Sequence, residues 1–451
     1  MVARFDWLRR AACLKKVTPA CEWLEFDFSG QACIMNGIRR RFERGSGVEI
    51  LSGKEIILGV TGGIAAYKAA ELVRGLTKKE AGVYVVMTRN AQEFITPLTL
   101  QTLSGNPVQT DLFCLIEDSK IGHVALADRA DVVVIAPATA NIIGKVANGI
   151  ADDFLSTMIM ATASPVLFAP SMNVNMWKSV AVQRNVTTLK KAGYHFIGPE
   201  EGDLACEAIG HGRLAAVADI VEYVEDLLVE KDMRGQRVLI TAGPTHEPMD
   251  PVRLITNRSS GRMGFALTRM ARRRGADVIL ISGPSHLAVP GRNVRVIPVR
   301  TASEMRDAVL EHYEECSAII KAAAVSDYRP KSTSSQKLKK SAARLSLELE
   351  RTPDILGEIG SLKGDRVLVG FAAETEHLIA NARKKLEQKD LDLIVANDVS
   401  RSDSGFGTET NRVVIIDSEG KTDRLPLKSK DEVATIVLDR VLEILKKKKR
   451  R

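Results

Sequence analysis

The chain has 451 residues, more than one compact core usually holds, so its length predicts two domains. Its 45% hydrophobic and 27% charged content is typical of a globular protein, and no apolar run approaches the roughly 18 to 20 residues of a membrane span. The formal net charge is +8, but six of these charges form the C-terminal run 446–451, and the body of the chain is nearly neutral. We therefore expect neither membrane insertion nor a nucleic-acid partner.

Both ends of the chain are predicted to lie outside the folded domains. Residues 1–53 mix arginine clusters with acidic residues and lack the apolar stretch of a secretory peptide, so we interpret them as a disordered extension or a start-site artefact that begins before Met35. Residues 446–451 are interpreted as a solvated basic tail. The six cysteines, at positions 13, 21, 33, 114, 206 and 316, form no CxxC pair, which favours a reducing, cytoplasmic location.

The first domain is predicted over residues 54–232. A strand-like apolar run is followed by Thr61, Gly62 and Gly63, and then by apolar residues at helical spacing from Ala65 to Leu76. Later segments indicate three more strands and a closing helix, at 83–88, 131–137, 165–170 and 219–228. Buried parallel strands have this near-continuous apolar character, so the pattern predicts α/β layers.

The second domain is predicted over residues 233–445, where the same kind of pattern starts again. A strand at 237–241, a helix at 262–274 and a strand at 277–282 open it, and later strands are expected at 318–325, 366–371, 392–396 and 412–417. The polar, lysine- and serine-rich stretch 331–344 is predicted to be a mobile loop. The fold class that follows is α/β, with two Rossmann-like domains.

The turn Val60-Thr-Gly-Gly-Ile-Ala-Ala-Tyr67 joins a predicted strand to a predicted helix. Backbone N–H groups at such a junction attract a phosphate, and glycine lets the backbone approach it closely. The turn lacks the GxGxxG pattern of a dinucleotide site, so a single phosphate is the better guest. By itself the turn is equally compatible with a glycine pair that serves packing only.

The signal becomes specific when further motifs are taken in order: Gly122-His123, Pro137-Ala-Thr-Ala-Asn141, Ala151-Asp-Asp153, Pro170-Ser-Met-Asn-Val-Asn-Met-Trp177, Leu204-Ala-Cys206 and Gly210-His-Gly-Arg213. With these motifs the region from about Lys54 to Leu228 resembles the FMN-containing cysteine decarboxylases, specifically phosphopantothenoylcysteine decarboxylase. The resemblance implies a flavodoxin-type fold, FMN as cofactor and assembly as trimers or their multiples.

The resemblance also implies roles for single residues. His123 would assist the oxidative and decarboxylation stage, Asn173 would hold the substrate carboxylate, and Cys206 on a flap would protonate or reduce the enethiol. Two positions depart from the family pattern, Ser171 in place of alanine and Glu207 in place of the glycine that follows the cysteine. The implied flavin-binding residues are Gly62, Gly63, Ile64, Thr88, Thr139, Ala140, Asn141 and Ser171.

The second half is similar to phosphopantothenate–cysteine ligase. The motifs are Ile240-Thr-Ala-Gly-Pro-Thr245, Asp250-Pro-Val-Arg253, Ile255-Thr-Asn-Arg-Ser-Ser-Gly261, Lys321-Ala-Ala-Ala-Val-Ser-Asp-Tyr328, Lys337-Leu-Lys-Lys340, Pro353-Asp-Ile-Leu356, Gly370-Phe-Ala-Ala-Glu374 and Ala396-Asn-Asp398. Bacterial members use CTP and Mg²⁺, and metal ligands cannot be assigned from the motifs. The similarity implies that Asn257 holds an acyl-cytidylate and that Lys337 neutralises developing charge. The implied CTP-binding residues are Asp327, Lys337, Pro353, Asp354, Ile355, Leu356, Phe371, Lys385 and Lys389.

The two resemblances support each other, because the product of such a ligase is the substrate of such a decarboxylase. Together they predict a bifunctional enzyme of coenzyme A biosynthesis that acts on 4'-phosphopantothenate, cysteine and CTP. They also predict a homo-oligomer in which the decarboxylase parts form trimers and the ligase parts form dimers. Such contacts together suggest a dodecamer. Two alternatives stay open at this point: an FMN-binding regulatory protein without turnover, and a relative that decarboxylates a peptidyl cysteine or modifies a flavin.

Overall fold

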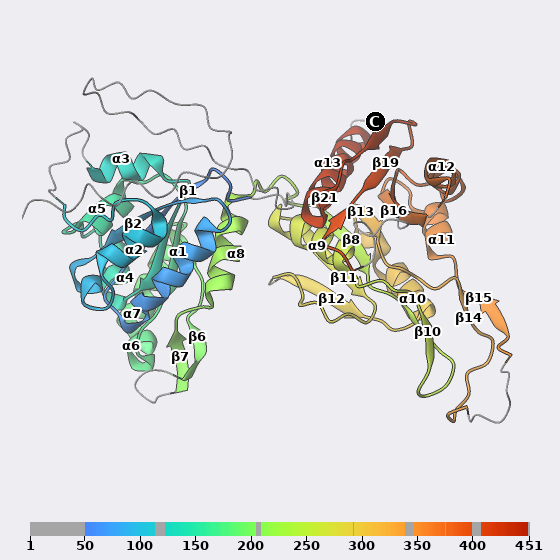
Figure 1. Ribbon diagram of the computed structural model, residues 1–451, viewed down its shortest axis with the longest axis horizontal. Helices are drawn as coiled ribbons and strands as arrows, with labels where there is room; N and C mark the ends of the chain where they lie inside the picture. The colour runs from blue at the N-terminus through green and yellow to red at the C-terminus, as the bar shows by residue number, and fades with distance from the viewer. Residues whose placement is uncertain are drawn as a thin grey trace, which may run out of the picture. The chain divides into compact units, whose positions relative to one another are not determined.

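The computed structural model describes residues 50–112, 122–203, 209–291, 293–338, 346–374, 376–398 and 407–449. Within them the chain forms two large β-sheets, each with helices on both faces (Figure 1). The core of the first part begins before the first strand, because the Leu51 side chain has no exposed surface. The predicted α/β class with two Rossmann-like parts is confirmed.

The first sheet has five parallel strands in the order β2-β1-β3-β4-β5. This is the strand order of flavodoxin-like folds, in which the ligand binds where the chain reverses its direction across the sheet, here between β1 and β3. All seven residues of β3 are buried, which explains the unbroken apolar run in the sequence. The strands are β1 (Glu55–Val60), β2 (Gly82–Met87), β3 (Val132–Ala138), β4 (Val166–Pro170) and β5 (His195–Phe196).

Two layers of helices cover this sheet. One layer contributes apolar side chains to a core on one face, and it consists of α1 (Ala69–Thr77), α2 (Pro97–Ser104) and α8 (Val217–Leu228). The other layer consists of α3 (Gly122–Arg129), α4 (Ala140–Ala147), α5 (Phe154–Ala161) and α7 (Val180–Lys191). The remaining elements are the short helices η1 (Ile64–Lys68), η2 (Arg89–Glu93) and α6 (Val174–Lys178), and the antiparallel pair β6 (Glu200–Asp203) and β7 (Ile209–Arg213).

The second sheet has eight strands in the order β12-β11-β8-β13-β16-β17-β19-β20. The six strands from β12 to β17 are parallel, and β19 and β20 extend the sheet in antiparallel fashion. The chain reverses its direction across this sheet between β8 and β13. The strands are β8 (Arg237–Ala242), β11 (Asp277–Ser282), β12 (Val294–Pro298), β13 (Ala318–Lys321), β16 (Val367–Glu374), β17 (Leu393–Asp398), β19 (Val413–Asp417) and β20 (Thr422–Arg424).

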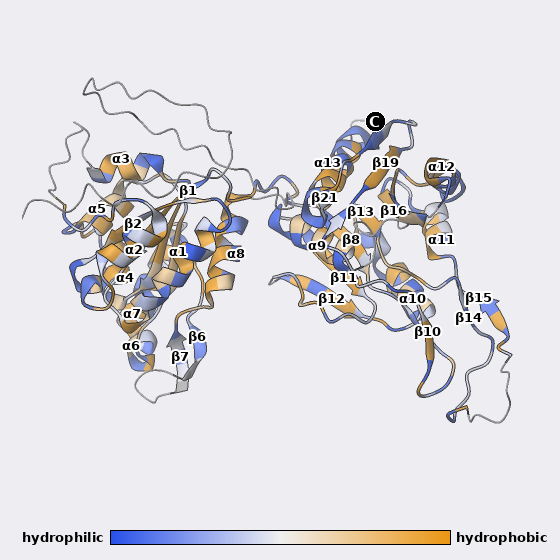
Figure 2. Ribbon diagram, viewed as in Figure 1, coloured by the Kyte–Doolittle hydropathy of each residue, from blue (hydrophilic) through white to orange (hydrophobic). Residues whose placement is uncertain are grey.

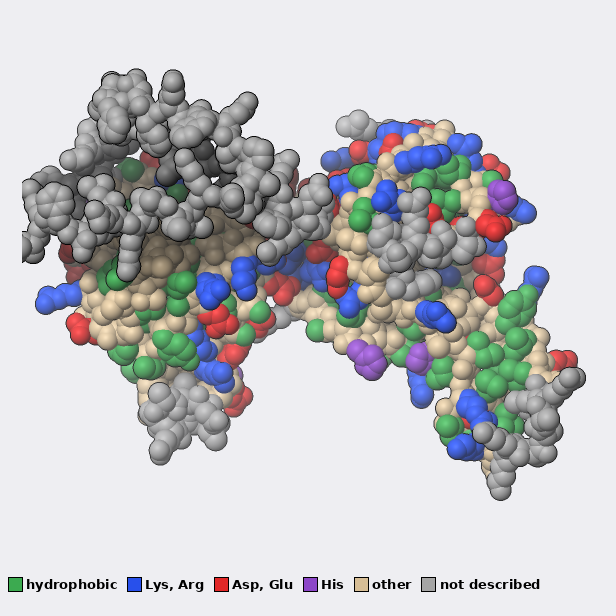
Figure 3. Space-filling model, viewed as in Figure 1, with side chains coloured by type: hydrophobic (Ala, Val, Ile, Leu, Met, Phe, Trp, Pro, Cys, Tyr) green, Lys and Arg blue, Asp and Glu red, His purple; other side chains and the backbone are tan. Residues whose placement is uncertain are grey.

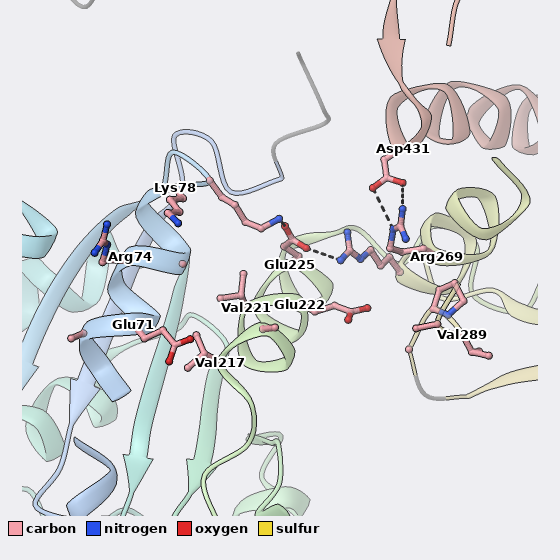
Figure 4. A pocket seen from close by; sticks show the side chains of 18 of the residues that line it. Glu71, Arg74, Lys78, Val217, Val221, Glu222, Glu225, Arg269, Val289 and Asp431 are labelled. Atoms are coloured by element: carbon pink, nitrogen blue, oxygen red, sulfur yellow. Dashed lines mark hydrogen bonds and ion pairs between the residues drawn. The ribbon is translucent and has the colours of Figure 1, made fainter. Parts of the chain in front are cut away.

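The helices of this part also form two layers. Helices α9 (Arg262–Arg273) and α13 (Lys430–Lys448) pack on one face, and α10 (Ala302–His312), α11 (Ile355–Leu362) and α12 (Leu378–Gln388) pack on the other. Figure 2 shows apolar residues along the strands and polar residues on the outer sides of the helices, as this layering requires. Arg269 of α9 forms an ion pair with Asp431 of α13 at 2.5 Å, which links the two helices of one layer (Figure 4).

Short two-stranded ribbons complete the second part, together with η3 (Tyr313–Glu315). They are β9 (His246–Pro248) with β10 (Leu254–Thr256), β14 (Tyr328–Pro330) with β15 (Leu349–Arg351), and β18 (Thr410–Asn411) with β21 (Lys428–Ser429). Apolar side chains are exposed on the β14–β15 ribbon, among them Tyr328 and Leu349 (Figure 3).

Several expected elements differ in extent from those observed; the strand expected at 366–371, for example, continues to Glu374 as β16. The helix expected from Ala65 begins as the 3-10 helix η1 and becomes α-helical only at Ala69. The strand expected over 318–325 ends at Lys321. The basic tail expected at 446–451 is helical as far as Lys448, because cations in the last turn of α13 interact favourably with the helix dipole. No helix in the described segments is long and apolar enough to cross a membrane.

Candidate functional sites

The first candidate site lies where β1 and β3 end side by side. Thr61, directly after β1, is buried and its Oγ1 donates to the carbonyl oxygen of Pro137 at 2.7 Å. The same Oγ1 accepts from the backbone N–H of Thr139 at 3.1 Å. These bonds hold the two turns together at the position where an open parallel sheet binds its ligand.

Glycine is required at one position of this turn. A Cβ on Gly62 would lie 2.4 Å from the Cβ of Asn90 and 2.9 Å from the backbone carbonyl of Asn90. Neither neighbour can move away easily, because Asn90 belongs to η2 and its backbone atoms are part of the contact. The glycine therefore serves a close approach between two loops, whereas Gly63 has room for a Cβ at 3.5 Å from Thr139.

All eight residues predicted to bind flavin follow the carboxyl ends of neighbouring strands. Gly62, Gly63 and Ile64 follow β1, and Thr88 follows β2. Thr139 is the N-cap of α4 and makes no side-chain cap hydrogen bond, Ala140 and Asn141 begin that helix, and Ser171 follows β4. The eight predicted residues thus lie at one edge of one sheet, the position where open parallel sheets bind phosphate-bearing ligands.

His123, the second residue of α3, is half-buried. Its ring meets the ring of Phe154 edge-on, with centroids 6.1 Å apart and planes at 89°. Its Nδ1 is buried and has no hydrogen-bond partner among the residues that the structure describes. A buried polar atom without a partner is uncommon and costs free energy, so it is a good candidate to contact a ligand. This orphaned atom beside the edge of the first sheet fits a bound flavin and its substrate.

Asn173 is the N-cap of α6, and its Oδ1 accepts from the backbone N–H of Asn175 at 2.8 Å. The preceding residue, Met172, donates its N–H to Gly212 of β7 at 3.0 Å, which ties this turn to the β6–β7 hairpin. The predicted residue Cys206 and the departure Glu207 belong to the segment between β6 and β7 that lies outside the described residues.

The second candidate site is a cavity of about 780 Å³ in the second part of the chain. It lies at the carboxyl ends of β13 and β16. The segment between β10 and α9, which contains Asn257 and Gly261, lines another side. Eight of the nine residues predicted to bind CTP line it, together with Asn257. They are Asp327, Pro353, Asp354, Ile355, Leu356, Phe371, Lys385 and Lys389.

One wall of the cavity is the N-terminus of α9. Gly261 caps this helix in the left-handed conformation, with φ of 81°, and its N–H donates to the Oγ of Ser259 at 3.3 Å. A Cβ on Gly264 would lie 2.4 Å from the Cβ of Ala242, so glycine lets α9 pack directly on β8. Asn257 donates from Nδ2 to the carbonyl oxygen of Ala324 at 3.1 Å, which fixes its side chain at the cavity rim.

The opposite wall carries charged residues from α11 and α12. Lys389 forms an ion pair with Asp354, and Asp354 also caps α11 by accepting from the N–H of Gly357 at 3.0 Å. Burial tends to raise the pKa of Asp354, but the hydrogen bonds from Lys389 and Gly357 outweigh it and the pKa is lowered. Lys385 donates to the carbonyl oxygen of Phe371 at 3.3 Å, and burial lowers its pKa.

Lys337 is the predicted nucleotide residue that does not line this cavity. Its side chain is exposed on the segment that follows β14. The neighbouring Leu338 is anchored, because its N–H donates to Asp250 at 3.1 Å and its carbonyl oxygen accepts from Arg253 at 2.9 Å. The predicted Asp250-Pro-Val-Arg253 motif thus holds one end of the lysine-rich loop, whose residues 339–345 lie outside the described residues.

Two lysines of the cavity wall were given no role by the sequence. Lys321 ends β13, and Lys430 begins α13. Lys430 is 6% exposed and donates to the carbonyl oxygen of Thr408 at 2.5 Å and to Oδ1 of Asn411 at 3.1 Å. Lys321 begins one of the ligase motifs but was given no role, and Lys430 lies in none of them, because a lysine next to apolar residues is equally typical of a solvated strand or helix end.

Each sheet therefore has a candidate ligand-binding edge of its own, and the chain is an α/β protein with a flavodoxin-like part and a part with a lysine-lined cavity. Residues 47–229 match the family model described as flavoprotein. Residues 233–445 match the model described as the C-terminal domain of DNA/pantothenate metabolism flavoprotein.

Curated relatives extend this match to nearly the whole chain. The coenzyme A biosynthesis bifunctional protein CoaBC of Bacillus subtilis (strain 168) is 47% identical over 400 residues, which cover 88% of this chain and 98% of the relative. That of Escherichia coli (strain K12) is 43% identical over 406 residues, which cover 89% and 100%. A crystal structure of the C-terminal domain of a CoaBC protein is 41% identical, with a TM-score of 0.42, and covers 48% of this chain and 100% of its own.

The chain belongs to the family of coenzyme A biosynthesis bifunctional proteins. It is a flavoprotein and a bifunctional enzyme, with a decarboxylase and a phosphopantothenate–cysteine ligase activity that act on small molecules. The family and the enzyme class predicted from the sequence are confirmed, so the regulatory alternative without turnover is not retained.

Proposed function

We propose that the chain makes 4'-phosphopantetheine from 4'-phosphopantothenate, cysteine and CTP in two successive reactions, with FMN as the flavin. The observation that carries the nucleotide-dependent step is the cavity, because it collects eight of the nine residues predicted to bind CTP from four separate segments of the chain. An acyl-nucleotide ligase needs such a site to hold nucleotide and carboxylate in reacting geometry.

In the ligase reaction, a carboxylate oxygen of 4'-phosphopantothenate attacks the α-phosphorus of CTP, and pyrophosphate leaves. The amine of cysteine then attacks the acyl carbon of the acyl-cytidylate, loses a proton and displaces CMP. Asn257 at the cavity rim is proposed to hold the acyl-cytidylate, and the N-terminus of α9 to receive phosphate oxygens. Lys337 does not line the cavity in this structure, so its proposed role in neutralising charge requires it to come closer to the reacting groups.

Mg²⁺ is proposed to enter this site with the nucleotide. The described residues contain no group of three histidine, cysteine or acidic side chains that could hold a metal ion. Mg²⁺ commonly keeps several waters and binds substrate phosphates with one or two carboxylates, so such a cluster is not required. Its contribution there is neutralisation of phosphate charge.

In the decarboxylase reaction, the chemistry that bound FMN supplies is two-electron oxidation of the cysteinyl thiol and the later return of those electrons. His123 is proposed to exchange a proton or form a hydrogen bond with the substrate through its Nδ1, and the lack of another partner for this atom among the described residues supports the role. Asn173 is proposed to bind the carboxylate that leaves as CO2, and Cys206 to donate the proton that completes the saturated product.

The test is product analysis by mass spectrometry after the full-length protein is incubated with FMN, Mg²⁺, 4'-phosphopantothenate, cysteine and CTP under reducing conditions. We expect 4'-phosphopantetheine, CMP and CO2. Accumulation of phosphopantothenoylcysteine would contradict the decarboxylase assignment alone. Absence of any new product with CTP, but turnover with ATP, would overturn the choice of nucleotide.

The domain bounds 54–232 and 233–445, the cytoplasmic location and the oligomer stay predictions. We propose a homo-oligomer with trimeric contacts of the flavoprotein part and dimeric contacts of the ligase part, which together permit a dodecamer. Exposed apolar side chains on the flavoprotein part, such as Ile64 at 61% and Val180 at 85%, support contacts between copies. Mass photometry of the full-length protein would contradict the proposal if it showed only monomers.

A further inference from the structure

Asp250 lies in the turn between β9 and β10, and its side chain has no exposed surface. Its Oδ1 accepts from the backbone N–H groups of Val252 at 2.8 Å and Arg253 at 2.7 Å, which closes the turn. Its Oδ2 accepts from Nη1 of Arg253 at 3.0 Å and from the backbone N–H of Leu338 at 3.1 Å. One oxygen therefore shapes the turn, and the other reaches a segment 88 residues further along the chain.

The segment that Asp250 reaches is held through both backbone polar groups of Leu338. The N–H of Leu338 donates to Asp250, and its carbonyl oxygen accepts from Nη1 of Arg253 at 2.9 Å. Asp250 and Arg253 are themselves an ion pair, so one pair of charged side chains binds both groups. The adjacent Lys337 has an exposed side chain, and its backbone is therefore placed by the anchored residue beside it.

The carboxylate of Asp250 is ionised at neutral pH. Burial tends to raise its pKa, but three hydrogen bonds from backbone N–H groups, and then the charge of Arg253, outweigh burial and the pKa is lowered. Hydrogen bonds to an ionised acceptor are shorter and stronger than those between neutral groups. The anchor on Leu338 is therefore a charge-assisted contact rather than an ordinary hydrogen bond of a surface loop.

The same turn also leads to the cavity of the second part. Strand β10 begins directly after Arg253 and ends at Thr256, so Asn257 is the first residue beyond it. Asn257 lines the cavity, whereas Asp250 does not. The turn therefore connects the positions of two proposed site residues, that of Asn257 through one short strand and that of Lys337 through Leu338.

We propose that Asp250 is a positioning residue of the ligase, whose carboxylate fixes, through the backbone of Leu338, the point from which Lys337 serves the formation of the acyl-cytidylate. This inference rests on the proposed role of Lys337 in that reaction. A cation stabilises a transition state only where the charge develops. With Leu338 fixed, Lys337 searches a smaller volume, so less conformational entropy is lost when its ammonium group reaches the reacting charge.

The variant Asp250→Asn separates the tasks of the two oxygens. Its amide keeps one oxygen, which can still accept the N–H groups that close the turn, and it places an NH2 group against the donors of Arg253 and Leu338. We expect the backbone amide of Leu338 to exchange its hydrogen faster in this variant, as measured by hydrogen–deuterium exchange of the full-length protein. An unchanged exchange rate would overturn the proposal, because the anchor would then not depend on the carboxylate.

The kinetic test is pyrophosphate release in a single turnover of the full-length protein with CTP, Mg²⁺ and 4'-phosphopantothenate, without cysteine. We expect Asp250→Asn to lower the rate constant by roughly tenfold, because a catalytic group is then misplaced. The affinity for CTP should not change, since Asp250 does not line the cavity. Asp417→Asn is the matched control and should change neither quantity, because Oδ1 of Asp417 also accepts two N–H groups of its own turn, at 3.1 and 2.9 Å.

A double-mutant cycle with Lys337→Met distinguishes positioning from a general loss of structure. If Asp250 acts through Lys337, Asp250→Asn should slow pyrophosphate release no further once the lysine is replaced. A structural role predicts the same loss in both backgrounds, and that result would overturn the proposal.

The same cycle separates this inference from the proposed function, and it is run with whichever of CTP or ATP the wild-type protein turns over. Pyrophosphate release at the wild-type rate in Lys337→Met would contradict the proposed role of the lysine. A wild-type rate in Asp250→Asn beside a slow Lys337→Met would refute the positioning role of Asp250 alone.

Discussion

At the scale of single residues, His123 has a buried ring nitrogen whose hydrogen-bonding capacity is not satisfied by the described residues. Its Nδ1 is buried beside Phe154 and finds no partner in the described segments, a state that costs free energy. A bound ligand that supplies the missing partner would recover this free energy.

Replacement of His123 by asparagine should therefore separate the two activities. We expect the rate of 4'-phosphopantetheine formation to fall by roughly 100-fold or more, a usual effect of losing an acid–base group. Phosphopantothenoylcysteine should accumulate, because the ligase site is built from the second sheet. Mass spectrometry of both compounds measures this, and His286→Asn, at an exposed position of the second part, is the control. Equal loss of both products would contradict the assignment.

The pKa of Lys321 also predicts how stability depends on pH. Since its folded pKa of about 8 lies below its usual value of 10.5, the unfolded state binds more protons between these values, and stability rises with pH across that window. The rise from this group is at most about 1.4 kcal/mol per pH unit. Denaturant unfolding at pH 8 and pH 10 should show it as a difference between wild type and Lys321→Met. A difference independent of pH would contradict the lowered pKa.

At the scale of elements, the packing of α9 decides where its N-terminus meets the cavity. Gly264→Ala places a Cβ 2.4 Å from Ala242, so the helix must shift away from β8. We expect a loss of about 1 to 3 kcal/mol in stability and a higher KM for the nucleotide, with the decarboxylase rate on supplied phosphopantothenoylcysteine unchanged. Gly144→Ala is the matched helical control, because its nearest neighbour would be 3.6 Å away. An unchanged KM would refute this role of α9.

The elements also show what a single sequence can predict. Strand β3 is buried and apolar throughout, and its position follows from the sequence within one residue. The run at 318–325 is equally apolar, yet only its first four residues are strand. The others turn over the cavity, where the N–H of Ala324 donates to Gly243 and its carbonyl oxygen accepts from Asn257. An apolar run in the sequence does not show where a strand ends, because the residues of a buried strand and of the turn that follows it are both apolar here.

The candidate sites show a similar limit. Motif resemblance predicted the residues that line the cavity, such as Asp354 and Lys385, because chain order preserves which loops follow which strands. It did not single out Lys321, since one lysine at the end of an apolar run is usually solvated. Burial and the like charge of Lys385 distinguish it, and both arise only when β13 and α12 are brought together by the fold.

At the scale of the whole molecule, each activity is assigned to its own sheet and its own reversal point. The proposed ligase residues lie at the edge of the second sheet, and the proposed flavin residues at the edge of the first. No residue is shared between the two proposed sets. A change confined to one site should therefore leave the chemistry of the other intact, and the intermediate that connects them is a small molecule that can leave the protein.

This separation predicts complementation between two inactive full-length variants. His123→Asn should stop at phosphopantothenoylcysteine, and Asn257→Ala should make little of it, because Asn257 is proposed to hold the acyl-cytidylate. Their mixture should form 4'-phosphopantetheine after a lag, since the intermediate released by the first variant must reach a working concentration for the second. The time course, followed by mass spectrometry, should lose its lag when phosphopantothenoylcysteine is supplied. A mixture that accumulates this intermediate without converting it would mean that the second variant's flavin site depends on its own ligase site, against the independence of the two sheets.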